Sequence, residues 1–382
     1  MEKTRNDKIQ DIALTIIKPL VYVWMFLDAK RTVKVKGDLS FKRKEPFVMV
    51  ANHTFLFDVV HVPLWFKVVP FIVASQDLFT KQPTKFLLTR IAHVIPKSKG
   101  ESDLRTARDL IGAVRRGYPI LIFPEGNTTF CGETTHIEYS TMKLIKKLGV
   151  DVVTCNVKGG HLSNPRWATG KRKNRRIELN YEISIKKEEL SNLSVDEVSV
   201  IINHALYNHD YDYQREKMIK HPSKKMAEGL ENILYICPSC EGVNTMETKG
   251  NTLSCHQCNT TGYVDEYGFI QGFEFDNTVA WDHFQKQYRD LLRESVIEST
   301  GVLYFISFED STREYIGDIS IVYKNNTFVL DGALSEIIKL EDITNPIITL
   351  RRDFAFVYRK KYYYIKLDRF ASSLLRVSQD KY

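Results

Sequence analysis

The sequence predicts an α/β domain with a largely parallel sheet flanked by helices, followed by a zinc ribbon and a small all-β, pleckstrin-homology-like domain. Three observations support this prediction. Short β-type runs alternate with helix-period segments over residues 33–208, two Cys-x-x-Cys pairs follow within residues 237–258, and beyond about residue 300 the chain is almost all β. Strand–helix alternation is typical of parallel sheets, because parallel neighbours need a long crossover connection.

Length and composition indicate several globular domains. The chain has 382 residues, of which 43% are hydrophobic and 26% charged, an ordinary globular balance that argues against wholesale disorder. The formal net charge of +7 favours an anionic surface or a phosphorylated ligand over a dedicated nucleic-acid binder. We expect an interfacial helix at residues 1–30, the α/β domain at 31–220, the zinc ribbon at 221–272 and the β-rich domain at 273–382.

The most apolar stretch of the chain is Ile12–Leu27, and Lys18 and Pro19 interrupt it. As a helix this stretch would be about 24 Å long, short of the ~30 Å hydrocarbon core, so we expect no transmembrane span. Two interpretations remain open: a helix packed on the protein's own core, or one lying in a membrane interface. In the second case the anchors would be Tyr22, Trp24 and Phe26.

The α/β region has clear start and stop signals. Asp103 is a suitable N-cap for a helix at residues 104–116, and a second helix should begin near Thr54 and run to about Phe66. The remaining expected elements are strands Phe47–Ala51, Pro119–Phe123 and Val150–Val157, helix Tyr139–Leu148, and an edge or half-buried strand Ile177–Ile185. In such sheets, functional sites gather at the carboxyl ends of the strands.

A histidine and an aspartate follow the first buried strand. His53 comes two residues after Phe47–Ala51, and Asp58 is five residues further on. On one regular helix, side chains five residues apart diverge by about 140°, so the pair can meet only if His53 lies in the turn and Asp58 reaches back from the next helix. The carboxylate could then orient the imidazole, and His53 could deprotonate a hydroxyl group. The alternative is a chance spacing in which His53 only caps the turn.

The segment Phe123–Thr129 (FPEGNTT) follows another predicted buried strand and should therefore lie at the same edge of the sheet. Glu125 and Gly126 can present a carboxylate and an unhindered backbone N–H to a substrate. Taken alone, the segment is equally consistent with a Pro–Gly turn capped by threonine.

Together the two motifs resemble the glycerophospholipid acyltransferase family typified by the 1-acylglycerol-3-phosphate acyltransferases, whose blocks include NHxxxxD and FPEGTRS. Asn52–Asp58 matches the first block in full, and Phe123–Gly126 matches the start of the other. The resemblance covers roughly residues 30–215. The flanking sequence looks like a bacterial branch of the family that carries a zinc-ribbon extension.

The resemblance implies transfer of a fatty acyl group from a thioester donor, acyl-CoA or acyl carrier protein, to a hydroxyl of a lysophospholipid, by default 1-acylglycerol-3-phosphate. His53 would be the general base and Asp58 would orient it. The substrate-binding residues would be Lys97, Glu125, Gly126, Asn127 and Thr128.

Two departures from the family pattern concern the acceptor's phosphate. Lys97 stands where the second block usually has arginine, and the usual T-R-S of the other block reads Asn127–Thr129. Lysine is a point charge without the bidentate fork of a guanidinium group, so 1-acylglycerol-3-phosphate is only the default acceptor. N–H groups near Gly126 are candidates for stabilising the oxyanion, by position only.

Four of the six cysteines have the spacing of a zinc ribbon: Cys237, Cys240, Cys255 and Cys258. Four thiolates in two knuckles close the coordination sphere of zinc, so the metal would be structural and no catalytic metal is expected. Cys-x-x-Cys units whose thiols bind metal, and do not form disulfides, are typical of a reducing compartment.

The basic run Lys171–Arg176 is either a solvated loop or a patch that attracts anionic lipid headgroups. An acceptor held in a bilayer favours the second interpretation, so we expect a cytoplasmic enzyme peripheral to the inner face of the cell membrane. No nucleic-acid partner is expected. The alternative is a catalytically inactive lipid-binding or scaffolding protein that uses the zinc ribbon and the β domain for interactions.

Overall fold

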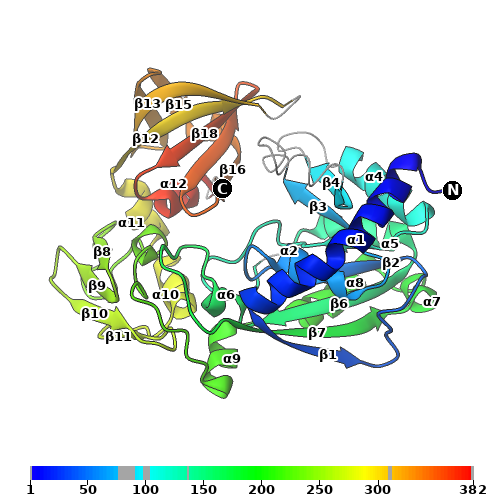
Figure 1. Ribbon diagram of the computed structural model, residues 1–382. Helices are drawn as coiled ribbons and strands as arrows, with labels where there is room; N and C mark the ends of the chain where they lie inside the picture. The colour runs from blue at the N-terminus through cyan, green and yellow to red at the C-terminus, as the bar shows by residue number, and fades with distance from the viewer. Residues whose placement is uncertain (1, 76–90, 98–103, 136, 309–311, 380–382) are drawn as a thin grey trace. The chain divides into compact units, whose positions relative to one another are not determined.

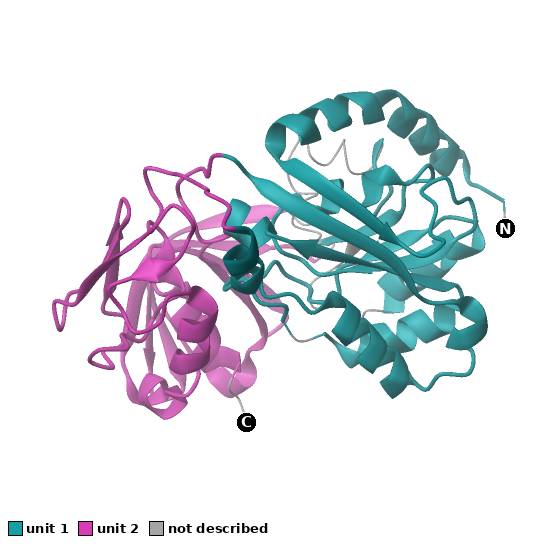
Figure 2. Cartoon of the chain, turned by 90° about the horizontal axis from the view of Figure 1, so that it is seen from below, with its two compact units in different colours: residues 1–164, 174–217 teal, residues 165–173, 218–382 magenta. Residues whose placement is uncertain are grey.

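The computed structural model describes residues 2–75, 91–97, 104–135, 137–308 and 312–379 (Figure 1). Contacts divide the chain into two compact units (Figure 2). Unit 1 comprises residues 1–164 and 174–217, and unit 2 comprises residues 165–173 and 218–382. The finer division into four parts that the sequence suggests stays a prediction.

A seven-stranded sheet forms the centre of unit 1, in the order β1-β7-β6-β2-β5-β3-β4. The five strands from β6 to β4 are parallel to one another, whereas β7 is antiparallel to β6 and parallel to β1. This confirms the largely parallel sheet, and it shows that the alternating strand at residues 177–185 lies inside the sheet. The strands are β1 (Lys30–Lys36), β2 (Phe47–Ala51), β3 (Phe71–Ser75), β4 (Val94–Lys97), β5 (Ile120–Ile122), β6 (Asp151–Lys158) and β7 (Arg176–Ile185).

The described helices of unit 1 confirm two expected helices and correct a third. The expected cap Asp103 lies outside the described residues, and the long helix expected over residues 54–66 is wrong. A single α-turn ends there before Pro63, which lacks the amide hydrogen that would continue it and instead opens a 3₁₀ turn. The helices are α1 (Arg5–Asp28), α2 (Asp58–His61), η1 (Pro63–Trp65), α4 (Leu104–Arg115), α5 (Tyr139–Leu148), α6 (Gly160–Ser163), α7 (Lys187–Leu190), α8 (Val195–Leu206) and α9 (Asp210–Lys217).

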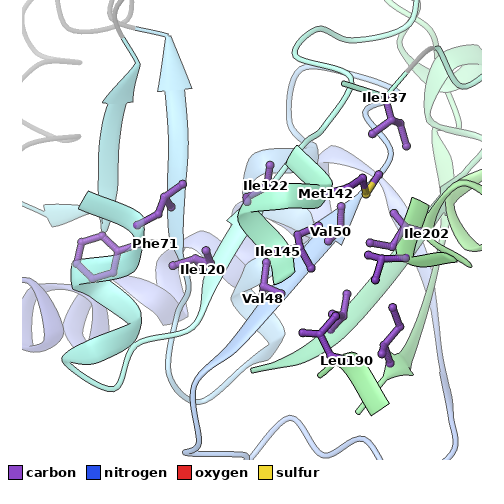
Figure 3. Close-up of a cluster of buried hydrophobic side chains, with 14 of the residues drawn as sticks. Val48, Val50, Phe71, Ile120, Ile122, Ile137, Met142, Ile145, Leu190 and Ile202 are labelled. Atoms are coloured by element: carbon purple, nitrogen blue, oxygen red, sulfur yellow. The ribbon is translucent and has the colours of Figure 1, made fainter. Parts of the chain in front are cut away.

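Strand β2 is buried along its whole length because hydrophobic clusters cover both faces of the sheet. Val48 and Val50 belong to one cluster, and the alternate residues Phe47 and Met49 belong to the other. Side chains of α5, such as Ile145, pack on the first face, as Figure 3 shows. A strand buried on both faces reads as a continuous apolar run, which is why the sequence predicted β2 with its exact bounds.

Helix α1 is longer than the apolar run predicted. A capping box begins it, in which the Asp7 N–H donates to Thr4 Oγ1 (3.1 Å) and the Thr4 N–H donates to Asp7 Oδ2 (2.8 Å). The 24-residue helix is long and apolar enough to cross a membrane by length and composition. The absence of a transmembrane span therefore stays a prediction, because the whole helix passes the length test that its apolar run alone does not.

The first part of unit 2 is a small antiparallel sheet in the order β11-β10-β9-β8. Two short helices follow it, and the fully buried Trp281 on the first of them donates from Nε1 to Ile236 O at 2.8 Å. The elements are η4 (Leu230–Asn232), β8 (Met246–Lys249), β9 (Thr252–Cys255), β10 (Thr261–Val264), β11 (Ile270–Gln271), α10 (Thr278–Gln285) and α11 (Arg289–Glu294).

The end of the chain forms a second seven-stranded sheet in the order β15-β14-β13-β12-β18-β17-β16, with antiparallel neighbours. This agrees with the predicted all-β character of the domain, while the likeness to pleckstrin-homology domains stays a prediction. The elements are β12 (Ile297–Ile306), β13 (Arg313–Lys324), β14 (Thr327–Gly332), β15 (Glu336–Lys339), η5 (Leu340–Asp342), β16 (Thr344–Thr349), β17 (Asp353–Tyr358), β18 (Lys361–Leu367) and α12 (Ala371–Gln379).

Candidate active site and metal centre

The structure brings the two sequence motifs together at the carboxyl ends of the neighbouring strands β2 and β5. The backbone of His53 is held from both sides by the second motif. Its N–H donates to Glu125 Oε1 at 2.7 Å, and its carbonyl oxygen accepts from the Thr129 N–H at 2.9 Å. The position of His53 is therefore fixed by residues more than 70 positions further along the chain.

His53 and Asp58 are in contact because the chain turns between them as the spacing requires. His53 lies in the turn after β2, and Asp58 is the first residue of α2. The distance from His53 Nδ1 to Asp58 Oδ2 is 3.2 Å, and the same oxygen accepts from the N–H groups of Thr54 (2.6 Å) and Phe55 (3.0 Å). Since Asp58 Oδ2 is an acceptor, the neutral imidazole carries its proton on Nδ1, and its Nε2 lone pair can accept a proton.

The imidazole of His53 is also held through its face. The Phe123 ring stacks on it with centroids 4.4 Å apart and an interplanar angle of 30°. The His53 side chain is nevertheless 14% exposed, whereas Asp58 is fully buried. An oriented imidazole with an accessible edge is the arrangement that general-base chemistry requires.

Both carboxylate oxygens of Glu125 are engaged within the protein. Besides the bond from His53 to Oε1, Oε2 accepts from the backbone N–H (2.7 Å) and the hydroxyl (2.9 Å) of Thr135. The residue is partly exposed, but its carboxylate lies deep in the loop, and this burial raises the pKa of Glu125. This geometry favours a positioning role, in which Glu125 holds the loop, rather than the substrate-binding role expected from the sequence.

The other expected substrate-binding residues lie in or near the same loop. Gly126 has φ +70°, a conformation that favours glycine, and its N–H donates to Phe123 O at 3.1 Å, so this N–H is not available to an oxyanion. Asn127 and Thr128 follow in the loop and are half-buried. Lys97 is the last residue of β4, and its side chain lies outside the described part of the structure.

Residues 32–158 match a family model described as acyltransferase. Over this span the chain is similar to the acyltransferase family. At the level of an acyltransferase domain, the match confirms the resemblance that the two motifs gave. Among solved structures, the 1-acyl-sn-glycerophosphate (LPA) acyltransferase PlsC from Thermotoga maritima is 20% identical with a TM-score of 0.42, over 58% of this chain and 86% of that chain, too distant a likeness to support an argument. No curated protein matches the sequence.

Two residues of this span that the sequence did not single out as site residues fix the surroundings of the turn that carries His53 and Asp58, called the His53 turn below. Asn52 joins β2 to β6, donating from Nδ2 to Val157 O (2.8 Å) and accepting from the Val157 N–H at Oδ1 (2.7 Å). At Gly160 an added Cβ would lie 2.0 Å from Thr54 Oγ1, so the turn after β6 packs directly against the His53 turn. The paired glycines at 159–160 were the sequence signal for this close approach.

Asp210 holds the turn after β6 through the backbone of that turn, and no pattern in the sequence indicated this role. It is fully buried, and its oxygens accept from the N–H groups of Gly159 (2.8 Å) and His161 (2.7 Å) and from Asn208 Nδ2 (2.7 Å). Burial raises the pKa of Asp210. A second buried carboxylate thus supports the loops at this edge of the sheet through backbone amides.

Helix α1 places polar contacts on its inner side and apolar side chains on its outer side. Lys18 Nζ donates to Phe66 O (2.7 Å) and the Tyr22 hydroxyl donates to Leu64 O (2.5 Å). The outward residues repeat at helical spacing and are 45–76% exposed: Ile9, Ile12, Ile16, Leu20, Val23 and Leu27. This set is called the α1 stripe below. The helix is therefore neither a simple core helix nor free of the domain.

The basic run expected to face lipid is partly engaged in internal contacts. Arg172 is buried, donates to Met226 O at 2.8 Å and lies over the Trp167 ring. Arg175 pairs with Asp28 at 2.8 Å. Lys171, Lys173 and Arg176 remain exposed, so only part of the run can attract an anionic surface.

The four cysteines predicted to bind metal converge in unit 2, and their sulfur atoms all lie within 4.8 Å of one another. The Cys237–Cys258 and Cys240–Cys255 sulfur pairs are 3.8 and 3.7 Å apart. Four sulfurs placed tetrahedrally at 2.3 Å from a zinc ion are about 3.8 Å apart, so the cluster fits this metal. The hydroxyl of Thr260, 3.2 Å from Cys258 Sγ, can donate to that thiolate.

Proposed function

We propose that this protein transfers a fatty acyl group from acyl-CoA or acyl carrier protein to a hydroxyl of a lysophospholipid, by default 1-acylglycerol-3-phosphate. The observation that carries the proposal is the His53–Asp58 pair in an acyltransferase-family domain, with the imidazole held by Phe123 and one edge accessible. The alternative, an inactive lipid-binding scaffold, does not account for a buried aspartate that orients this histidine.

In the proposed reaction, His53 Nε2 removes the proton of the acceptor hydroxyl while that oxygen attacks the thioester carbonyl carbon. Asp58 stabilises the imidazolium ion that forms. The tetrahedral intermediate collapses with cleavage of the carbon–sulfur bond, and the leaving thiolate takes the proton from His53. The products are an ester and a free thiol, and no covalent enzyme intermediate is needed.

We assign different roles to the remaining predicted residues. Glu125 is a positioning residue, because both of its oxygens are engaged by His53 and Thr135. Lys97, Asn127 and Thr128 stay our candidates for binding the acceptor. The four cysteines would hold structural zinc, which would supply folding free energy to unit 2 and take no part in the reaction.

The substrate places the enzyme at a membrane surface. A long-chain lysophospholipid resides in a bilayer, and the α1 stripe is an apolar surface of the kind that enters the interface. The exposed basic residues Lys171, Lys173 and Arg176 would add attraction to anionic headgroups. We therefore propose a peripheral location at the cytoplasmic face, where thioester donors and reduced thiols occur together.

The direct test is to mix the purified protein with vesicles that contain 1-acylglycerol-3-phosphate and to add either acyl-CoA or acyl carrier protein loaded with the same chain. Mass spectrometry should detect diacylated product, and a thiol reagent should detect an equal amount of free thiol. Other lysophospholipid headgroups in parallel vesicles would identify the acceptor. Tight lipid binding without ester formation from either donor would favour the scaffold instead.

A further inference from the structure

The turn between β16 and β17 exposes an apolar side chain in an unfavourable conformation. Leu350 has φ +53° and is 60% exposed. The left-handed region is disfavoured for residues with a Cβ, and glycine or asparagine is the usual choice there. Residues in such strained backbone conformations cluster at functional sites, so a solvent-exposed leucine at this position suggests a function for the turn.

Arg166 fixes this turn. Its Nε donates to Leu350 O and its Nη2 to Ile348 O, both at 2.5 Å. Arg166 belongs to the segment 165–173 of unit 2, and burial lowers its pKa to about 9, so it stays charged at neutral pH. Because one carbonyl near the end of β16 and one in the turn both accept from Arg166, the backbone that presents Leu350 is held in place.

Exposed basic side chains surround Leu350. Arg351 and Arg352 follow it in the turn, and Arg352 Nη1 donates to Asp368 O at 2.8 Å, which places the end of β18 beside the turn. Lys366 on β18 lies opposite Asp353 in the ladder. Among the described residues, Arg351, Arg352 and Lys366 form no ion pair, and Arg369 lies 3.9 Å from Glu247.

The turn at the opposite end of β17 also carries two basic residues, but an acidic residue lies beside them. Its turn contains Arg359 and Lys360, both exposed, and Arg359 lies 3.8 Å from Glu336. Next to Glu336 in the chain is Ile337, which is 70% exposed. This end therefore combines basic and apolar groups with an acidic neighbour, and it provides matched controls.

We infer that the Leu350 turn is a membrane contact in unit 2, where Leu350 enters the apolar edge of an anionic bilayer and Arg351, Arg352 and Lys366 bind lipid phosphates. The inference rests on the proposed function, in which the acceptor lies in a bilayer. A soluble phosphate would satisfy the charges but would leave Leu350 in water. A bilayer surface satisfies both, since anionic headgroups adjoin an apolar phase.

The test measures co-sedimentation of the full-length protein with phosphatidylcholine vesicles, with and without phosphatidylserine. Leu350→Gly relieves the positive φ, so it should keep or raise the melting temperature while weakening vesicle binding several-fold. Arg351→Gln with Arg352→Gln should weaken binding to the anionic vesicles by about 25-fold, roughly fivefold for each charge. The controls are Ile337→Gly and the pair Arg359→Gln with Lys360→Gln, for which we expect changes below about twofold.

Equal binding by wild type and both Leu350-turn variants would overturn the inference, as would an equal loss in the controls. Vesicle binding by the wild type that does not respond to phosphatidylserine would also overturn it. Failure of the proposed function is distinguishable, because it would appear as absent acyl transfer to a short-chain acceptor dispersed in water. All Leu350-turn variants should retain that activity.

Discussion

The His53 turn and the four-cysteine cluster differ in what holds them together. The four thiols of the cluster come from residues 237–258, and their sulfur atoms converge within 4.8 Å of one another. His53 and Asp58 are equally close in sequence, but distant residues hold the turn that carries them. Glu125 accepts a hydrogen bond from the His53 N–H, and the Thr129 N–H donates to the His53 carbonyl oxygen. With the proposed metal bound, the cluster would depend on an ion from solution and the His53 turn on the fold of the domain, so the two should fail independently.

The largest expected effect is loss of the metal. Cys237→Ser should release one tightly bound ion per chain, since structural zinc in small domains contributes about 10–16 kcal/mol of apparent binding free energy. Elemental analysis should show the loss, and hydrogen exchange should show loss of protection in residues 237–264. Cys131→Ser, outside the cluster, should keep the metal. A metal-free wild type, or metal retained by Cys237→Ser, would refute the ribbon.

Loss of the general base comes next. His53→Ala should lower kcat by about 10²–10⁴-fold, or roughly 3–5 kcal/mol, while metal content and melting temperature stay unchanged. Asp58→Ala added to His53→Ala should cost little more, because the pair acts as a unit. The exposed His204 on α8 provides the control, and His204→Ala should be fully active. Near-normal turnover by His53→Ala would show that the base lies elsewhere.

Removal of the support around His53 should have an intermediate effect. A glutamine at position 125 offers only one acceptor oxygen. Its NH2 group would therefore face another hydrogen-bond donor, the backbone N–H of either His53 or Thr135. We expect Glu125→Gln to lower kcat by about 10–100-fold with little change in KM. Thr135→Val removes only the hydroxyl donor and should act in the same direction, more weakly. A raised KM at unchanged kcat would instead restore Glu125 to the substrate-binding role.

The smallest effect should come from the α1 stripe. Each of Leu20→Ser and Leu27→Ser should weaken vesicle binding by about tenfold, because each removes an apolar side chain that would enter the interface. Activity on vesicle-borne acceptor should fall, and activity on a dispersed short-chain acceptor should not. Val200→Ser on α8, which is 70% exposed, should leave binding unchanged. Unimpaired vesicle binding by both stripe variants would exclude α1 as the docking element.

Much of the fold follows from local patterns that the sequence carries. β2 reads as a continuous apolar run, α5 ends at Gly149 with φ +63°, and the strands of the second sheet alternate. The elements that were missed lack such patterns or depend on neighbours. β1 is mostly exposed and charged, and α1 gains its first turns from a capping box and from pairs such as Asp7–Arg116, 2.8 Å apart across the fold.

The candidate site divides in the same way. The His53–Asp58 spacing and the cysteine spacing are local, so the sequence revealed them. The engagement of Glu125 was not predictable, because Thr135 reaches its Oε2 only through the path of an irregular loop. Asp210 is similar, since its backbone partners at 159 and 161 lie about 50 residues upstream and its own sequence context is that of an ordinary helix start.

The contact between Trp24 and Phe57 links two processes that are usually considered separately. The rings lie edge to face with centroids 5.0 Å apart, and Phe57 directly precedes Asp58. The helix proposed to meet the bilayer thus also packs against the His53 turn. Under the proposed function, lateral pressure or curvature in the leaflet would act on α1, and a small tilt of the helix would change how Asp58 orients the imidazole. The rate of the proposed acyl transfer would then depend on the packing of the surrounding lipids.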